Sequence, residues 1–191
     1  MRPRPRRRAS LAIGTILFLC AGAHAADCTD NIPGKLNNRF SDNGNGTATD
    51  TVTRLIWQRC VLSTTLNTTG QCSGINFSGP VSYTWQEALQ EADKFNQAEA
   101  VAGRPNTWRV PNIKELATIV DMHCMYDTFW AIDTKVFPGE NTTYWSSTPV
   151  VQVDAQYDNT KRQNGAWTID FLSGREAQTA VGMTNVVRLV R

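Results

Sequence analysis

The first part of the chain alternates polar and apolar positions, which is typical of strands. Phe40 leads into a turn-forming run of Asp, Asn and Gly over residues 42–46, and alternation follows over 47–53. Residues 55–57 are a short apolar run that ends in Trp57. We therefore predict a β-hairpin over residues 39–57, with a buried strand at its end.

Two later segments repeat their apolar residues with helical spacing. The first covers residues 84–95, where Thr84 and Glu87 form a capping-box pattern. The second begins after Pro111, where Asn112 and Glu115 form the same pattern. The apolar stripes consist of Trp85, Ala88, Leu89, Ala92 and Phe95 in the first helix, and of Ile113, Leu116, Ala117 and Val120 in the second.

The C-terminal part again favours strands. We expect them at residues 144–148, at 167–171, at 178–181 after a turn at 173–174, and at 186–190. In the second of these, Trp167, Ile169 and Phe171 share one face, with Thr168 and Asp170 opposite. Strands at both ends around two central helices predict an α+β domain with a small, mainly antiparallel sheet, spanning residues 39–191.

The N-terminus has the pattern of a secretory signal peptide over residues 1–25. Five arginines precede an apolar run over residues 11–19, and Ala23-His24-Ala25 is a small-x-small cleavage site. We therefore expect an exported protein, either periplasmic, secreted or at the cell surface. Residues 26–38 are then a polar lead-in to the domain.

Removal of this leader changes the charge of the protein. The whole chain carries 19 basic and 17 acidic residues. Without the five leader arginines, 14 basic residues face 17 acidic ones, a net charge of −3. This balance gives no expectation of nucleic-acid binding, and no later apolar run is long enough to predict insertion into a membrane.

Removal of the leader also takes away Cys20 and leaves four cysteines, which predict two disulfides outside the reducing cytoplasm. Sequence alone allows three pairings. Cys60 and Cys72 bracket a segment rich in Thr, Asn and Gly that has little else to hold it, so we expect a Cys60–Cys72 bond. Cys28 would then pair with Cys124. A metal site is disfavoured by the cysteine spacing and by the single remaining histidine, His123, which we expect at the C-terminus of a helix.

The sequence contains no catalytic motif of a hydrolase or a phosphate-binding enzyme, so we expect no catalytic residues and no cofactor. The alternative is a calcium site at the turn after Phe40, because Asp and Asn side-chain oxygens on a glycine-rich turn are the ligands that Ca²⁺ uses. We favour a plain hairpin turn, in which Asn and Gly supply positive φ. The calcium candidates are Asp42, Asn43, Asn45 and Asp50.

Residues for ligand binding are expected on the irregular segments 61–82, 123–143 and 149–165, since loops carry specificity more often than regular elements do. Trp130 lies in the second of these segments, between Phe129 and Ile132, where its ring can stack on a sugar or anchor a partner. The other candidates lie in the segment 149–165. They are Tyr157, Asp158, Lys161 and Arg162.

Six stretches in order carry a resemblance to a known family. The chain resembles the bacterial DUF1566, or Lcl C-terminal domain, family over nearly all of its predicted mature length. The stretches are Arg39-Phe40-x-Asp42-Asn43-Gly44, Leu55-Ile56-Trp57-Gln58-Arg59-Cys60, Tyr83-Thr84-Trp85-Gln86-Glu87-Ala88-Leu89, Trp108-Arg109-Val110-Pro111-Asn112-Ile113-Lys114-Glu115-Leu116, Tyr144-Trp145-Ser146-Ser147 and Val187-Arg188-Leu189-Val190-Arg191.

The resemblance implies a C-type-lectin-like fold, with paired N- and C-terminal strands and long irregular loops. It also implies a non-catalytic binding module, adhesive in role, for a glycan or another component of the cell envelope or extracellular matrix. The family is similar to formylglycine-generating oxidases, but these need a C-terminal cysteine pair and no cysteine follows Cys124. A structural subunit of an envelope or pilus-like assembly is the other alternative. The signature residues are expected to maintain the fold, with Arg109 paired to Glu115 or Asp170.

Overall fold

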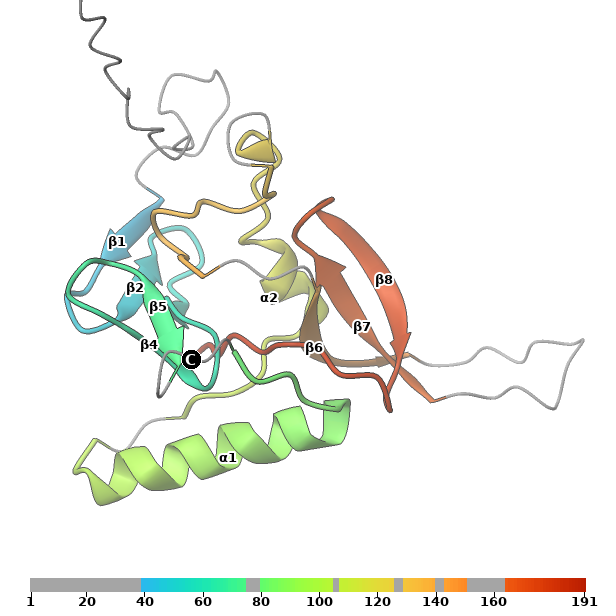
Figure 1. Cartoon of the computed structure of the whole chain (residues 1–191), viewed down its shortest axis with the longest axis horizontal. Helices are drawn as coiled ribbons and strands as arrows, with labels where there is room; N and C mark the ends of the chain where they lie inside the picture. The colour runs from blue at the N-terminus through green and yellow to red at the C-terminus, as the bar shows by residue number, and fades with distance from the viewer. Residues whose placement is uncertain (1–38, 75–79, 105–106, 126–128, 140–142, 151–163) are drawn as a thin grey trace, which may run out of the picture.

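The computed structural model describes residues 39–74, 80–104, 107–125, 129–139, 143–150 and 164–191. The predicted leader and lead-in, residues 1–38, lie outside this range. The described residues form two α-helices and three separate antiparallel sheets (Figure 1). The α+β class is therefore confirmed, but three small sheets replace the single sheet that we predicted.

The first sheet contains β1 (Phe40–Asp42), β2 (Thr47–Asp50) and β3 (Ile56–Gln58) in sequence order. Strands β1 and β2 pair with Phe40 opposite Asp50, which confirms the predicted hairpin and its turn. The glycines of the turn, Gly44 and Gly46, have φ of +73° and +81°, a conformation that side chains with a Cβ rarely adopt.

The second sheet is a hairpin of β4 (Thr64–Leu66) and β5 (Cys72–Gly74), which pair only with each other. A Cys60–Cys72 disulfide joins this hairpin to the end of β3 and confirms that predicted pairing. Cys124 is also disulfide-bonded. Its predicted partner, Cys28, lies outside the described residues, so that pairing stays a prediction.

The third sheet contains β6 (Thr143–Val150), β7 (Gly165–Asp170) and β8 (Arg175–Ala180). Strands β7 and β8 meet at the predicted turn, where Gly174 has a φ of +68°. Strand β8 starts three residues before the predicted strand, because pairing with β7 continues down to Asp170 and Arg175. We expected a polar face on β7, but Ala166 and Thr168 are buried as fully as Ile169 on the opposite face.

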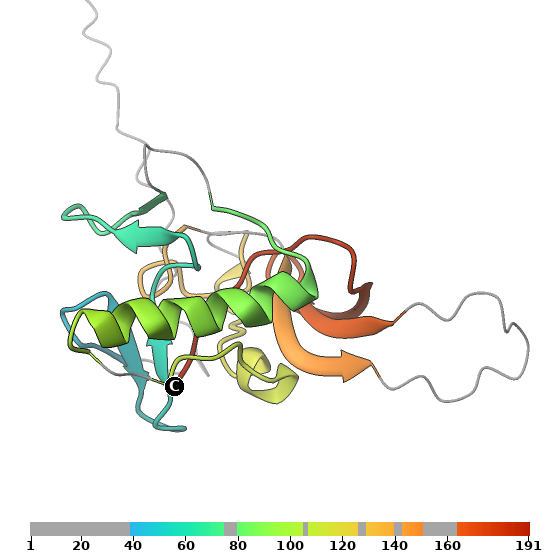
Figure 2. The same cartoon turned by 90° about the horizontal axis from the view of Figure 1, so that it is seen from below.

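Both predicted helices exist, with capping boxes at Thr84 and at Asn112, but their lengths differ from the prediction. Helix α1 (Trp85–Val101) runs past the predicted end at residue 95 and lies beneath the sheets in Figure 1, and Figure 2 shows its full length. Helix α2 (Ile113–Ala117) has only five residues, because the amides of residues 118–120 bond three residues back and tighten the chain into turns.

The C-terminal segment 186–190 is fully buried and divides the hydrophobic core into two clusters. Val186 and Val190 belong to the cluster beside α2, while Val187 and Leu189 belong to the cluster beside α1. We predicted a strand here. The segment alternates as a strand does but forms only isolated bridges, to Trp57, Arg109 and Tyr144.

Arg188 is the charged residue at the centre of this segment and is completely buried. Its Nη1 donates to the backbone oxygens of Gln58, at 2.9 Å, and of Arg59. The guanidinium also lies over the rings of Phe137 and Tyr144, 4.8 and 5.6 Å from their centroids. These contacts tie the C-terminal segment to the end of β3, so the N- and C-terminal parts of the domain are joined side by side.

Candidate functional site

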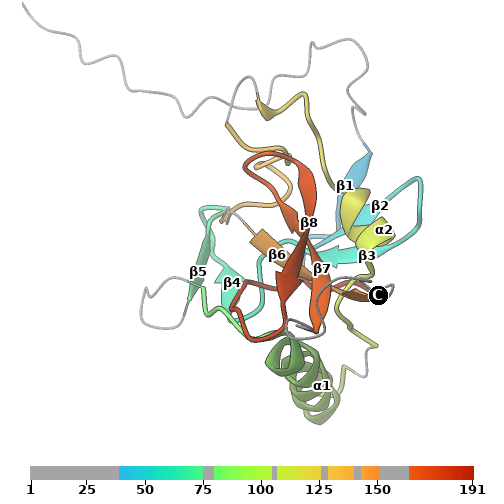
Figure 3. The ribbon, with the colours of Figure 1, turned by 90° about the vertical axis from the view of Figure 1, so that its right-hand side faces the viewer.

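A groove of about 840 Å³ lies where three parts of the molecule meet. Its walls are the β1–β2 turn, the β4–β5 hairpin and the C-terminal half of α1, and Arg191 lies at its edge. Figure 3 shows that the β4–β5 hairpin stands apart from the sheet of β1, β2 and β3. The residues that line it include Asn45, Gln58, Thr65, Asn67, Phe95 and Trp108.

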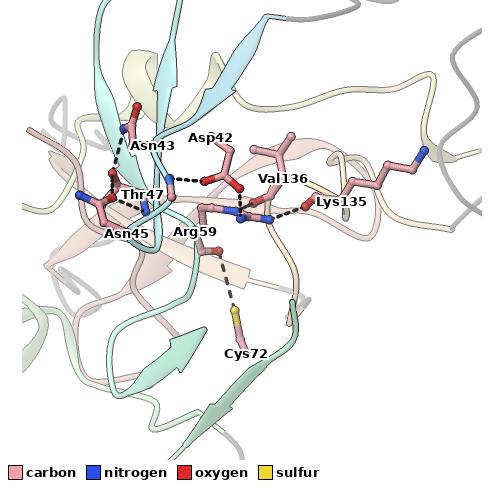
Figure 4. A network of polar contacts seen from close by, with 9 residues as sticks. Asp42, Asn43, Asn45, Thr47, Arg59, Cys72, Lys135 and Val136 are labelled. Atoms are coloured by element: carbon pink, nitrogen blue, oxygen red, sulfur yellow. Dashed lines mark hydrogen bonds and ion pairs between the residues drawn. The ribbon is translucent and has the colours of Figure 1, made fainter. Parts of the chain in front are cut away.

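The β1–β2 turn forms the first wall and is held by its own side chains (Figure 4). Asn45 accepts hydrogen bonds from the amide and the hydroxyl of Thr47, at 3.2 and 2.7 Å. Asn43 donates to the Thr47 hydroxyl at 2.9 Å, and Asp42 accepts from the amide of Gly44 at 2.8 Å. The turn is therefore shaped before any ligand arrives.

The same geometry bears on the calcium candidates. Asp42 pairs with Arg59 at 2.6 Å, and Asp50 lies at the other end of β2, where it pairs with Arg39 at 2.5 Å. Within the described residues, no group of three or more His, Cys, Asp or Glu side chains is placed to hold a metal ion. Calcium binding by Asp42, Asn43, Asn45 and Asp50 stays the untested alternative to a plain hairpin turn, and an ion there would compete with these arginines.

Arg59 connects this turn to a distant segment of the chain (Figure 4). Besides its ion pair with Asp42, it donates to the backbone oxygens of Val136 and Lys135, at 2.9 and 2.8 Å. Only 12% of its side chain is exposed. One guanidinium with three acceptors therefore fixes the turn against residues 135–136, as the planar donor geometry of arginine allows.

The β4–β5 hairpin forms the second wall. Its turn is held by Asn67, whose side-chain oxygen accepts from Thr69 and from the amide of Gln71 at 2.9 Å. Asn67 and Thr65 line the groove. The disulfide at Cys72 attaches this hairpin to the end of β3.

The third wall is the end of α1 with the segment that follows. Asn96 holds Trp108 by two bonds, donating to its carbonyl at 2.7 Å and accepting from its amide at 2.8 Å. The Trp108 ring packs edge-on to Phe95 and lies 4.8 Å from the Arg191 guanidinium. Because Trp108 is only 3% exposed, the ring supports the wall and has little face left for stacking on a ligand.

The lining offers neutral polar groups that the protein itself does not use. Within the described residues, the side chains of Gln58, Thr65 and Thr68 have no hydrogen-bond partner, and all three line the groove. The buried indole nitrogen of Trp108 also has none. The charged pair of the lining, Arg104 and Glu99, is joined at 2.8 Å. Arg191 adds a guanidinium to the lining. The groove can therefore exchange hydrogen bonds with a polar ligand mainly through neutral groups.

The most strongly held carboxylate is Asp50, which is fully buried at the end of β2 away from the groove. Burial by itself would raise its pKa, but hydrogen bonds from Arg39, Thr53 and the amide of Val52 outweigh burial and lower the pKa to about 2. An acid that stays ionised at neutral pH and is enclosed by donors suits a structural role, not proton transfer.

Arg109 pairs with Glu115 through two bonds of 2.6 and 2.7 Å, which confirms one of its two expected partners. The hydrogen bond from Arg109 lowers the pKa of Glu115, against a smaller rise from burial, and the Asn112 amide lowers it further. The same bond raises the pKa of Arg109. The pair extends the capping box of α2, so it serves the helix start.

We had expected His123 at the C-terminus of a helix, but it lies in a turn several residues after the end of α2. Its Nδ1 is 3.1 Å from a carboxylate oxygen of Asp121, beside a cavity of about 60 Å³. Among the described residues, no hydroxyl or thiol side chain hydrogen-bonds to this ring. Within the described part of the chain, the dyad therefore has no adjacent nucleophile of the kind that acyl-transfer enzymes use.

Among the ligand-binding candidates, Trp130 lies away from the groove: it is partly buried and packs against the core cluster beside α2, whereas its neighbour Phe129 is 78% exposed. Tyr157, Asp158, Lys161 and Arg162 lie outside the described residues, so their role stays a prediction. Residues 64–68 of the irregular segment 61–82 and the calcium candidate Asn45 do line the groove. The sequence therefore pointed to one wall, but it did not predict that the three walls meet.

The fold and the groove define an α+β domain with a preformed polar cleft. The family model of the Lcl C-terminal domain matches residues 46–191, so the chain belongs to this family. No curated protein matches it. In the described part of the chain, no helix combines the length and apolar character needed to cross a bilayer.

Proposed function

We propose that the protein is an exported, non-catalytic binding module of C-type-lectin-like fold that holds a glycan in the groove. The ligand would belong to the cell envelope or extracellular matrix. One observation carries the proposal: three fixed walls enclose neutral hydrogen-bonding groups that have no partner within the described residues. The N-terminal signal pattern and the family support the export and the binding role.

The chemistry of the lining favours a hydroxyl-rich ligand with little net charge. The amide of Gln58 can both donate and accept, and the Thr65 hydroxyl can do the same, which matches the alternating donors and acceptors of sugar hydroxyls. The Glu99–Arg104 pair sits at the side and neutralises itself. A pocket that binds through fixed polar groups gains specificity because a wrong ligand would leave these groups unpaired.

The oxidase alternative has less support. The three described cysteines, Cys60, Cys72 and Cys124, are all disulfide-bonded, and no cysteine follows Cys124 in the sequence. Formylglycine-type oxidation needs a reactive thiol pair, which this arrangement does not offer. Turnover of a cysteine-containing peptide with copper would contradict the non-catalytic proposal.

The proposal is tested with the mature protein on an immobilised panel of neutral glycans (chitin oligomers, dextran, mannan) and anionic ones (heparin, alginate). We expect binding to at least one neutral glycan. The same panel run with calcium and with EDTA tests the calcium prediction, because a calcium-dependent site would lose binding in EDTA. Failure to bind any glycan on the panel would reject the ligand class.

The groove itself is tested by Gln58→Ala. Loss of one or two hydrogen bonds to the ligand costs about 1 kcal/mol, so binding to the best panel glycan should weaken roughly fivefold. Gln178→Ala is the matched control, since Gln178 is exposed on β8 in a different sheet. Equal affinity of both variants and the parent would show that the glycan binds elsewhere, for example at residues 157–162.

A further inference from the structure

The β4–β5 hairpin forms a wall of the groove without belonging to the core. Among the described strands, its two strands pair only with each other. None of residues 63–74 is buried, and none contributes to either core cluster. Displacement of the hairpin would therefore change the groove while leaving the packing of the domain intact.

Within the described residues, the hydrogen bonds that hold this hairpin to the rest of the molecule lie at its base. There the amide of Val81 donates to the hydroxyl of Ser63 at 2.9 Å, Ser63 also bonds to the side chain of Tyr83, and the hydroxyl of Thr64 donates to the nearby carbonyl of Val61. A two-stranded hairpin alone is marginally stable in water. The bond between Cys60 and Cys72 adds a covalent restraint on its second strand.

The disulfide also touches the segment that Arg59 fixes. At Gly139 an added Cβ would lie 2.9 Å from the Cβ of Cys72, and the φ of +78° further restricts this position to glycine. Arg59 holds the same segment three residues earlier, at the carbonyl of Val136. The disulfide therefore sits between the hairpin wall and the segment that braces the turn wall.

We infer that the Cys60–Cys72 disulfide is a redox-sensitive lock that keeps the groove competent to bind. Cys72 is partly exposed, whereas Cys60 is buried. A thiolate of a dithiol reductant attacks the Cys72 sulfur, forms a mixed disulfide and releases Cys60 as a thiolate that takes up a proton. The second thiol of the reductant closes its own disulfide, so two electrons and two protons end on the two cysteines.

The reduced protein keeps its core but loses a fixed wall. A ligand must then order the hairpin as it binds, and this conformational entropy is subtracted from the binding free energy. For glycan binding the inference rests on the proposed function. We expect the affinity for the best panel glycan to fall by about tenfold or more.

Two measurements on the mature protein test the lock separately. Amide exchange over residues 63–74 reports release of the hairpin without any ligand, and the glycan panel reports binding. Each is done on the parent before and after mild dithiothreitol treatment, and on Cys60→Ser/Cys72→Ser without reductant. The variant keeps the bond at Cys124 intact, so it isolates the Cys60–Cys72 bond from the second disulfide.

The expected result is fast exchange over 63–74 in the reduced parent and in the variant, together with weaker glycan binding. Exchange should stay unchanged at core amides that are hydrogen-bonded, such as those of Trp145 and Val190. Slow exchange over 63–74 in both would overturn the inference whatever the glycan result. Fast exchange with unchanged glycan affinity would also overturn it. If the oxidised protein binds no glycan, the proposed function fails, and the exchange data alone decide whether the disulfide holds the hairpin.

Discussion

At the scale of single residues, the buried charges of this domain are held by defined hydrogen bonds. Asp50 accepts from Arg39 at 2.9 and 2.5 Å, and Arg188 donates to two backbone oxygens at the end of β3. Removal of one partner from such a pair leaves the other charge buried and unpaired, which costs more than the pair itself contributes. These residues therefore make the domain sensitive to conservative substitutions.

The pKa of about 2 at Asp50 predicts a specific loss of stability in acid. Because this pKa is depressed below its ordinary value of 3.8, the stabilisation is complete above about pH 5 and is lost as the pH falls through 2. It is worth about 2 kcal/mol. Asp50→Asn should lower the unfolding free energy by roughly 3 kcal/mol at pH 7, since Arg39 is left unpaired.

Urea unfolding of parent and Asp50→Asn at several pH values measures this effect. The difference between them should shrink steadily from pH 5 to pH 2, because the parent loses its ionised carboxylate over this range. Asp93→Asn, on the exposed side of α1, is the matched control and should track the parent. A difference that does not change with pH would show that the carboxylate charge is not what stabilises the site.

At the scale of elements, the sequence predicted those turns and helix starts that depend only on residues close together in the chain. The hairpin turn after Phe40 and both capping boxes were found, because each depends on residues a few positions apart. The end of α1 was missed although Gly103 marks it: its φ is +74°, and the amides of Gly103 and Arg104 bond back to the last turn. The apolar stripe stops at Phe95 because only the first part of α1 packs on the core.

The groove was not predictable in this way. It joins residues near position 45 to others near 65, 100 and 191, and only tertiary structure brings them together. No periodicity in the sequence signals such a meeting point. The Cys60–Cys72 pair was predictable because the bond closes a short local segment, whereas the contact of Gly139 with Cys72 is a long-range contact without a sequence signal.

Arg59 provides the element-scale prediction, because it fixes the β1–β2 turn to residues 135–136. Arg59→Ala removes three hydrogen bonds and should raise amide exchange both in residues 42–47 and in residues 133–139, at a cost of roughly 1–3 kcal/mol in unfolding free energy. Arg59→Lys keeps the charge but cannot reach three acceptors at once, so it should restore only part of the protection. Faster exchange in one segment alone would show that Arg59 does not couple the two.

At the scale of the whole molecule, the C-terminal segment determines how the domain holds together. Five buried residues, 186–190, pass between the two core clusters and face them alternately. The β3 strand on one side and β6 on the other both bond to this segment, with the Ile56 amide donating to the Arg191 carbonyl and the Trp145 amide donating to that of Val186. Neither cluster is complete without it.

This arrangement predicts a single cooperative unfolding transition. Leu189→Ala should lower the unfolding free energy by roughly 2–5 kcal/mol, because Leu189 is 1% exposed and leaves a cavity in the cluster beside α1. The loss should appear equally in tryptophan fluorescence, which samples Trp57 in one cluster and Trp145 in the other, and in circular dichroism of the backbone. Leu172→Ala, in an exposed turn, should change the midpoint little. Two separated transitions in Leu189→Ala would show that the cluster beside α2 folds without its neighbour. The C-terminal segment would then border two independent cores, not join them into one.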